Sequence, residues 1–379
     1  MTMERVAEFS EAYQKRHELA QEWKDQGKRV FGVLYGKVPE EILSAADIVP
    51  VQLVEDREHA SYVSGKPSLD RFYCDFVVNL WGQGLKGIYD YLDGIVMYDA
   101  CEAAKVLAGV WFLRKKVPFF YWYPCSEETK EGARIFHQKE MNQFKARIEE
   151  FAGRRISSDD LSKAIRTYNE NRSLMKRLYQ ARREDPSLIS EREFFEVFQA
   201  GLVMPKEQHS RMVYKLLERI VSEASPKKKP GPRLFLSCVI SEECISSETD
   251  LVSMVEELGG EIVSDDLLFG PRYYWEPTPL TKEPMEDLLD RYIGGMPMPF
   301  KSKSEQWTEL LVEEARRQKV QGAIVVIPKY CTLYLWDYPF LQSRFEKAGI
   351  KTLVIEGQEN IPQARTLTRI EAFLETLAH

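Results

Sequence analysis

The sequence is poor in cysteine and histidine and has no long hydrophobic run. Six cysteines and five histidines in 379 residues are too few for a disulfide framework and few for a metal site built from imidazoles. No segment has the roughly 18 or more apolar residues of a membrane span. Residues 1–30 are charged and amphipathic and lack the apolar region of a secretory signal. We therefore expect a cytoplasmic protein without a membrane partner, whose thiols stay reduced.

Positive charge is not in excess, and the common nucleotide-binding motifs are absent. The chain has 52 Lys and Arg against 59 Asp and Glu, a formal net charge of −7, which argues against a nucleic-acid partner. It has neither a GxxxxGK[ST] loop nor a GxGxxG strand–helix fingerprint, so we expect it neither to hydrolyse ATP itself nor to bind a dinucleotide. The composition, 44% hydrophobic and 29% charged, is that of a globular chain with two or three domains.

Short hydrophobic segments alternate with helical patterns in both halves of the sequence. Such alternation predicts α/β domains whose parallel sheets are covered on both faces. Residues 131–224 have few glycines and many charges and predict successive helices, and the Pro- and Lys-rich residues 225–232 have the character of a linker. We predict an N-terminal α/β domain with a leading helix at 1–130, a helical segment at 131–224 and a C-terminal α/β domain at 232–379. The predicted strands are 29–34, 47–54, 94–98, 119–123, 234–240, 262–264, 323–327 and 352–356.

Several polar side chains have no obvious partner nearby in the sequence and are predicted to be solvated. In the helical segment these are Lys176, Arg177, Arg182 and Arg183. Among the histidines they are His59, His137, His209 and His379. Near the C-terminus a helix is predicted at 338–348.

Three cysteines share one kind of position. Cys101 and Cys331 each follow a predicted strand by three or four residues and precede a helical pattern, and Cys74 also precedes a helix. In parallel α/β sheets ligands bind beyond the carboxyl ends of the strands, beside helix N-termini that favour thiolates. The spacing matches no compact iron–sulfur or CxxC motif. Two interpretations stay open: reduced cysteines packed as small hydrophobes, and three ligands of an iron–sulfur cluster with an open fourth position.

Other residues are weaker candidates for a site. Cys125, Cys238 and Cys244 also follow strands, and we interpret them as loop or packing residues. Glu55 and Asp56 follow the second strand, where a carboxyl group could act as an acid or a base. Arg272 and Tyr273, in the aromatic segment 270–275, are candidates for binding a CoA phosphate or stacking on adenine. The alternative for that segment is a structural loop.

Several blocks resemble a known family. These blocks are VPEEILSAADIVPV (38–51), SDDLLFGPRYYW (264–275) and QGAIVVIPKYCTLYLWDYP (321–339). With the segments around Cys74 and Cys101, they resemble the 2-hydroxyacyl-CoA dehydratase and benzoyl-CoA reductase family in the same order along nearly the whole chain. Segments 168–186 and 200–209 are most similar to the small cluster-bearing subunit, known as the C-type subunit, of ATP-dependent benzoyl-CoA reductase.

The resemblance implies two flavodoxin-like (Rossmann-like) domains with a 4Fe–4S cluster between them. By resemblance its ligands are Cys74, Cys101 and Cys331, and a fourth position can hold water or substrate. It also implies a heterodimer with a homologous second catalytic subunit, an acyl-CoA substrate, and low-potential electrons from a separate iron–sulfur ATPase activator.

The chain departs from the family pattern at a few positions. The family often has Asp after the second and third cysteines, where this chain has Glu102 and Thr332. The position near Tyr35 and Gly36 commonly differs as well. These differences leave the acyl group open.

The implied reaction is the reductive dearomatisation of benzoyl-CoA to a cyclohexadiene-carbonyl-CoA, a step of anaerobic aromatic degradation. One alternative is the dehydration of a 2-hydroxyacyl-CoA through a ketyl radical. Another is a non-catalytic subunit that serves as scaffold or electron relay in such a heterodimer. The sequence predicts an enzyme subunit, with the reductase reaction as the leading hypothesis and the other two roles as alternatives.

Overall fold

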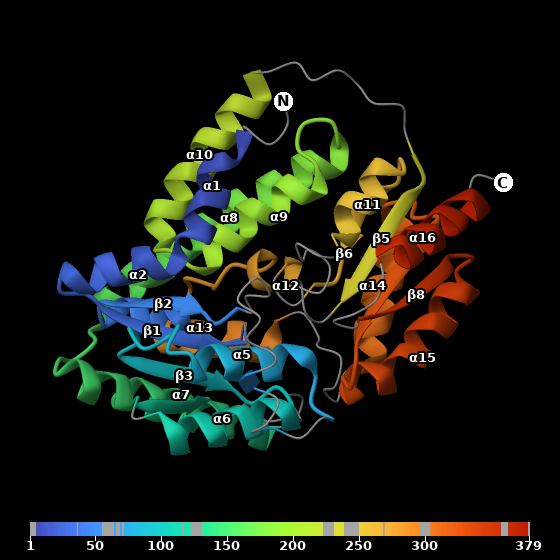
Figure 1. Cartoon of the computed structure of the whole chain (residues 1–379). Coiled ribbons are helices and arrows are strands. Elements are labelled where there is room, and N and C mark those ends of the chain that lie inside the picture. Colours follow the sequence, from blue (N-terminus) through green and yellow to red (C-terminus); the bar gives the residue numbers. More distant parts are fainter. Residues whose placement is uncertain are drawn as a thin grey trace.

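Two four-stranded, all-parallel sheets form the framework of the computed structural model. The structure describes residues 5–35, 37–54, 64–65, 69, 72–115, 117–122, 131–222, 231–238, 250–267, 270–295, 304–357 and 363–377. Figure 1 shows the sheets at opposite sides of the molecule, with a group of helices beside both. The fold class is therefore α/β, consistent with two flavodoxin-like domains, as predicted.

The first sheet has the strand order β2-β1-β3-β4. Because helices cover this sheet, β2 and β3 are buried along their whole length and β1 at every residue but its first. This burial explains their continuous apolar sequences, which are typical of parallel strands. The strands are β1 (Arg29–Leu34), β2 (Ile48–Gln52), β3 (Gly94–Tyr98) and β4 (Phe119–Trp122).

Four helices belong to the first sheet: α2 (Arg16–Asp25), α3 (Glu40–Ala45), α5 (Asp75–Leu85) and α6 (Glu102–Arg114). Helices α5 and α6 pack against each other, and the rings of Trp81 and Trp111 lie 6.0 Å apart at that contact. The four predicted strands of this half thus form where the sequence placed them, with ends that differ by at most two residues.

The second sheet repeats the order of the first, as β6-β5-β7-β8. Helices α11 and α16 pack together, as do α14 and α15, and each pair takes part in its own hydrophobic cluster. The sheet is therefore covered on both faces, as the alternating pattern predicted. Its strands are β5 (Arg233–Cys238), β6 (Glu261–Asp265), β7 (Gly322–Pro328) and β8 (Lys351–Gly357). Its helices are α11 (Leu251–Glu257), α14 (Ser304–Arg317), α15 (Thr332–Lys347) and α16 (Gln363–Leu377).

The helical segment comprises α7 (Glu131–Ala152), α8 (Ser158–Glu184), α9 (Glu191–Leu202) and α10 (Lys206–Ser222). Capping boxes fix where two of these helices begin. The Ser157 side chain accepts from the Asp160 N–H at 3.1 Å and Asp160 accepts from the Ser157 N–H at 3.0 Å. Ser190 and Glu193 form the same reciprocal pair at α9.

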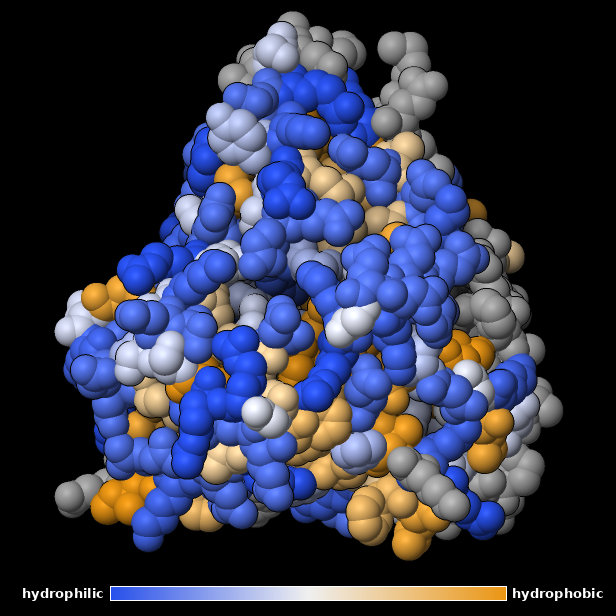
Figure 2. All heavy atoms as spheres, turned by 90° about the vertical axis from the view of Figure 1, so that its left-hand side faces the viewer, coloured by the Kyte–Doolittle hydropathy of each residue, from blue (hydrophilic) through white to orange (hydrophobic). Residues whose placement is uncertain are grey.

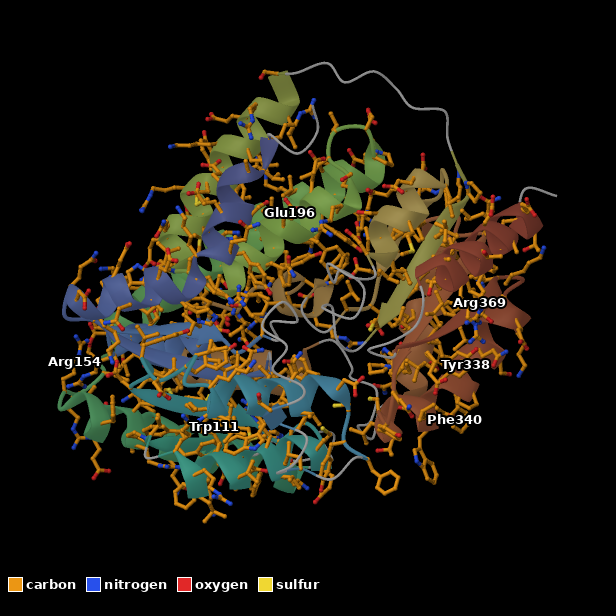
Figure 3. The ribbon with its side chains drawn as sticks, viewed as in Figure 1. Trp111, Arg154, Glu196, Tyr338, Phe340 and Arg369 are labelled. Carbon is orange, nitrogen blue, oxygen red and sulfur yellow. The ribbon has the colours of Figure 1, made fainter. Side chains whose placement is uncertain are left out.

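Helix α8 connects the two sheets. It packs on α3 of the first half and on β6, α12 (Pro271–Tyr274) and α13 (Pro284–Gly294) of the second half. The N-terminal helix α1 (Ala7–Gln14) packs on α9, where Ser10 donates to Glu196, which is labelled in Figure 3. The helical segment therefore joins the N-terminal helix and both sheets into one body.

Some predictions of solvated side chains were wrong. Arg182 and Arg183 are buried, and each forms an ion pair, Arg182 with Glu191 at the start of α9 and Arg183 with Glu314 of α14. Arg177 is exposed, as predicted. His137 and His209 are buried, and His59 and His379 lie outside the described residues.

The predicted start of the helix at residue 338 was also wrong. Helix α15 begins at Thr332 and continues through Pro339. Proline removes one intrahelical hydrogen bond, and the packing of Tyr334, Leu341 and Phe345 into the core of the second half holds the helix on both sides of it.

The outer surface is mostly polar on the side shown in Figure 2. On this face, which lies at the left of Figure 1 over α2 and α10, hydrophilic side chains predominate and apolar ones occur in interrupted groups. No helix among the described residues is both long enough and apolar enough to cross a membrane.

Candidate functional site

The candidate site lies at the carboxyl end of the first sheet. The strand order reverses between β1 and β3, which pair in parallel register with Leu34 opposite Met97. Tyr35 directly follows β1, and Cys101 follows β3 by three residues. In open α/β sheets this switch point opens a crevice beyond the strand ends, where ligands bind.

The three predicted cysteines all stand at the N-cap positions of helices. Cys74 is the N-cap of α5, Cys101 of α6 and Cys331 of α15. The sulfur of Cys101 accepts a hydrogen bond from the Ala104 N–H at 3.4 Å. Helix N-termini present free N–H groups and partial positive charge, which stabilise a thiolate. The predicted position before a helix is thus confirmed for all three.

One buried phenol connects these cysteines. Tyr35 is 5% exposed and has a φ of 68°, a left-handed conformation that is rare for a side chain of this size. Its pKa is raised well above the ordinary value by burial and by the neighbouring Cys101, Cys74 and Cys331 thiols, and its hydroxyl forms a hydrogen bond with Cys101. All three thiols therefore lie close enough to act on the same group.

Aromatic contacts hold the three segments together. The ring of Tyr35 lies 5.7 Å from the ring of Phe76, two residues after Cys74. The rings of Phe72 and Tyr330 are perpendicular, with centroids 6.0 Å apart. Because Phe72 precedes Cys74 in the first half and Tyr330 precedes Cys331 in the second, this contact places the two cysteine segments side by side.

Cys74 is shielded from water, whereas Cys101 and Cys331 are partly exposed. Cys74 is 6% exposed, and burial raises the pKa of the Cys101 thiol, although the Ala104 and Ala103 N–H groups and the Tyr35 hydroxyl act in the opposite direction. Within the described part of the chain no group of three His, Cys, Asp or Glu side chains is close enough to hold a single metal ion. An iron–sulfur cluster is larger than one ion and prefers cysteine thiolates alone. Three N-capping thiols near one phenol fit such a cluster, which would keep one iron position open.

The other predicted site residues have different surroundings. The Arg272 side chain is 4% exposed and forms an ion pair with Asp266. The Tyr273 hydroxyl donates to Glu40 at 2.7 Å. Both line a small cavity of about 30 Å³, and their predicted role in binding substrate stays a prediction. Cys238 is fully buried at the end of β5, in agreement with a packing role. Glu55, Asp56, Cys125 and Cys244 lie outside the described residues.

Sequence reasoning missed a buried polar cluster next to the site. Arg172 on α8 donates to Glu41 on α3 at 2.5 Å, and the Tyr292 hydroxyl of α13 donates to the same carboxylate at 2.8 Å. Lys206 of α10 lies 3.7 Å from Glu40. Burial raises the pKa of Glu41, but Arg172 and Arg291 outweigh it, so the pKa of Glu41 is below its ordinary value. The paired glutamates after Pro39 were the one signal in the sequence, since two adjacent carboxylates in an apolar segment require cationic partners.

The sequence matches a known protein family and several of its members over most of the chain. Residues 36–377 match the family described as 2-hydroxyglutaryl-CoA dehydratase, D-component, and the chain belongs to that family. It is 27% identical to the (R)-phenyllactyl-CoA dehydratase beta subunit of Clostridium sporogenes over 93% of this chain and 92% of that protein. It is 23% identical to the C-type subunit of the benzoyl-CoA reductase of Thauera aromatica over 92% and 91% of the two chains. The lactoyl-CoA dehydratase subunit beta of Anaerotignum propionicum is 24% identical over 93% of each.

Proposed function

We propose that this chain is the iron–sulfur subunit of an acyl-CoA enzyme that uses single low-potential electrons. The observation that carries the proposal is the convergence of Cys74, Cys101 and Cys331 from both halves of the chain on Tyr35. Family membership supports an enzyme-subunit role. Relatives named as dehydratase and reductase subunits support an acyl-CoA thioester as the substrate class.

The protein supplies the binding and the environment for the cofactor. Cys74, Cys101 and Cys331 would hold a 4Fe–4S cluster, whose chemistry when bound is one-electron transfer at low potential. The N-termini of α5, α6 and α15 would stabilise the negative charge of the thiolates. Tyr35 donates its hydroxyl proton to a hydrogen bond with the Cys101 sulfur. Burial of Cys74 and Tyr35 keeps water away from the sulfur atoms.

Iron analysis tests the cofactor assignment. After anaerobic reconstitution, the full chain is expected to hold about four iron and four sulfide per chain. Cys74→Ser, Cys101→Ser and Cys331→Ser are each expected to lose most of the cluster and its visible absorbance. Cys238→Ala is the matched control, since that thiol is fully buried at the end of β5 and is expected to leave the iron content unchanged. A folded chain that binds no iron, or cysteine variants with normal iron content, would overturn the assignment.

We further propose reductive dearomatisation of benzoyl-CoA as the first reaction to test, because segments 168–186 and 200–209 resemble the small reductase subunit. Dehydration of a 2-hydroxyacyl-CoA is the second candidate, and the 27% identity to a phenyllactyl-CoA dehydratase subunit supports it. The reconstituted complex, with its second subunit, an ATPase activator, ATP and a reductant, is assayed with both thioesters. Turnover of the 2-hydroxyacyl-CoA alone would refute the reductase assignment.

The partner subunit in this proposal binds near the cysteine site. Trp336 and Phe340 on α15 are 78% and 65% exposed, and Phe72 is 62% exposed. Figure 3 shows Phe340 at the outer edge of the second half. Exposed aromatic side chains in one region are typical of a protein interface. We expect Trp336→Ser to weaken co-purification with the second subunit, whereas substitution of exposed Arg155 leaves it unchanged.

A further inference from the structure

Tyr330 has an unusual backbone conformation directly before Cys331. Its φ is 61°, a left-handed value that costs free energy for any residue with a side chain. The chain turns here from β7 into α15: the Cys331 N–H donates to the Pro328 carbonyl at 3.0 Å and the Thr332 N–H to the Tyr330 carbonyl at 2.9 Å. Backbone strain persists only where the surrounding structure holds it, and it is concentrated at functional sites. We therefore examined what holds Tyr330.

A ring from the other half of the chain contacts the Tyr330 side chain. The rings of Phe72 and Tyr330 have centroids 6.0 Å apart and planes at 90°. Phe72 precedes Cys74 by two residues, so each ring belongs to a segment that carries a cysteine of the site. An edge-to-face ring pair stabilises a contact by about as much as one left-handed residue destabilises it. The contact and the strain therefore nearly offset each other, and the pair can open at little cost.

The surroundings of the ring pair differ from those of a core contact. Phe72 is 62% exposed, so separation of the rings brings only a small additional apolar area into water. Trp81 and Trp111, whose rings are also 6.0 Å apart, are buried. The Lys329 ammonium lies 5.1 Å from the centroid of the Tyr330 ring, and this cation–π contact stays when the rings separate, because both residues are in one segment. These features favour a contact that opens and closes over a permanent part of the core.

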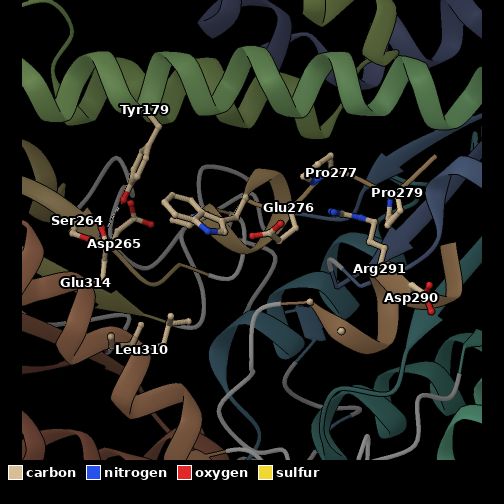
Figure 4. A pocket seen from close by; sticks show the side chains of 15 residues that line it. Tyr179, Ser264, Asp265, Glu276, Pro277, Pro279, Asp290, Arg291, Leu310 and Glu314 are labelled. Carbon is tan, nitrogen blue, oxygen red and sulfur yellow. Dashed lines mark hydrogen bonds between the residues drawn. The ribbon is translucent and has the colours of Figure 1, made fainter. Parts of the chain in front are cut away.

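The large pocket of the second half does not lead to the thiols. Its volume is about 370 Å³, and Figure 4 shows the side chains from α8, α13 and α14 that contribute to its walls. None of the three cysteines lines it. Cys101 and Cys331 are nevertheless partly exposed, whereas Cys74 is buried. Solvent therefore reaches two of the thiols from another direction, and the ring pair of Phe72 and Tyr330 stands beside one of them in the chain.

We propose that the rings of Phe72 and Tyr330 form a gate between the two halves of the chain, which controls the access of small molecules to the three thiols. When the gate is closed, the ring contact holds the Cys331 segment against the Cys74 segment. When it is open, the two segments separate locally, while α8, which packs on α3 and on β6, keeps the halves together. The inference deepens the proposed function and rests on it for its purpose, since one-electron chemistry at these thiols requires the exclusion of water.

Thiol modification of the full-length chain, before any iron is added, tests the gate. The two reagents are N-ethylmaleimide and fluorescein maleimide, which react by the same chemistry but differ in size. Mass spectrometry follows the peptide of each cysteine separately, and Cys238, which is fully buried at the end of β5, is the internal standard for the folded state. A gate affects the bulky reagent more than the small one, whereas a change in the reactivity of a thiol affects both equally.

Two variants remove the ring contact from opposite sides. Phe72→Ala and Tyr330→Ala are each expected to raise the rate of fluorescein maleimide at Cys74 and Cys331 about fivefold, the effect of one edge-to-face ring pair on an equilibrium. The rate of N-ethylmaleimide is expected to rise less. The double variant is expected to react about as fast as either single variant, because both substitutions remove the same contact.

Two control variants keep the gate. Tyr330→Phe retains the ring and is expected to react at the wild-type rates. Phe112→Ala removes a ring of similar exposure, 66%, from α6, the helix that begins after Cys101, and is also expected to keep those rates. Unchanged rates in Phe72→Ala, or an equal increase with both maleimides, would refute the gate. Increases that multiply in the double variant would show that the rings act separately and would refute it as well.

Failure of this inference is distinguishable from failure of the proposed function. The maleimide assay needs no iron, so a chain with gated thiols that binds no iron would reject the cluster and keep the gate. A chain that binds iron but shows the same fluorescein maleimide rates with and without Phe72 would reject the gate alone. In the reconstituted chain, release of iron to a bulky chelator is expected to be about fivefold faster in Phe72→Ala, and an unchanged rate of release would likewise refute the gate.

Discussion

Protonation of His209 should destabilise the fold well above the pH at which most carboxylates titrate. His209 on α10 is 1% exposed. Its Nε2 donates to the Val197 carbonyl at 2.8 Å, and its Nδ1 lies 2.8 Å from the Asn171 amide nitrogen, from which it accepts. Only the neutral ring satisfies both bonds, because a second ring proton would face an N–H donor. Burial and the nearby Lys206 ammonium lower the pKa of His209 to about 3.

The size of the effect follows from the two pKa values. In the unfolded chain a histidine titrates near pH 6.5, so between pH 6.5 and about 3 the unfolded state binds a proton that the folded state rejects. Stability is therefore fully present above pH 6.5 and is lost as the pH falls through this window. At pH 5, about 1.5 units below the unfolded pKa, the loss is about 2 kcal/mol at 1.36 kcal/mol per unit.

The assay is urea unfolding of the wild type and of His209→Gln at pH 7, 6 and 5. Glutamine keeps one donor and one acceptor but does not titrate. The wild type is expected to lose about 2 kcal/mol more than the variant between pH 7 and 5, while contributions from other groups cancel in the difference. A difference that stays constant with pH, or a ring pKa near 6.5 by NMR in the folded protein, would refute the reasoning.

Three further predictions concern the core and the cysteine site. Arg172→Met leaves a buried carboxylate without its cation and should cost about 3–5 kcal/mol in chemical denaturation; a cost below about 1 kcal/mol would contradict the burial of the pair. Gly94→Ala would place a methyl group well inside van der Waals contact with the ring of Phe31 and should lower stability by about 1–3 kcal/mol, whereas an unchanged midpoint would show that the ring moves freely. Tyr35→Phe removes the hydrogen bond to the Cys101 sulfur and should make the midpoint potential of the bound cluster more negative by about 40 mV, the equivalent of about 1 kcal/mol, in an anaerobic redox titration. An unchanged potential would contradict that bond.

The strands were predictable because their signals are local. Strand β3 is a run of five apolar residues between polar turns, and such a run has few alternatives to a buried strand. The positions of the three cysteines at helix N-termini were predictable for the same reason, since Cys101 and Cys331 each follow a strand and Cys74 directly precedes α5, while their role as ligands stays a prediction. The boundaries at 130, 224 and 232 stay predictions, and the structure shows that α13 packs on α7 and α8 of the helical segment.

The rest depended on contacts between distant residues. Arg182 donates to the Ile262 carbonyl, 80 positions away, and Arg172 pairs with Glu41 across 131 positions. The place of Tyr35 among the thiols depends on a left-handed backbone conformation directly after β1, which the residue type does not predict. Side chains held by long-range pairs are those that pattern reasoning assigns to solvent.

The packing of α1 on α9 has a consequence for how the chain is made. Ser10 and its partner Glu196 are 186 residues apart, and the ring of Phe9 lies 5.9 Å from that of His209. At about 5–20 residues per second, the first helix leaves the ribosome about 10–40 s before the surface it covers exists. During that interval the apolar side of the helix, with Phe9 at its centre, is exposed to chaperones and to other nascent chains.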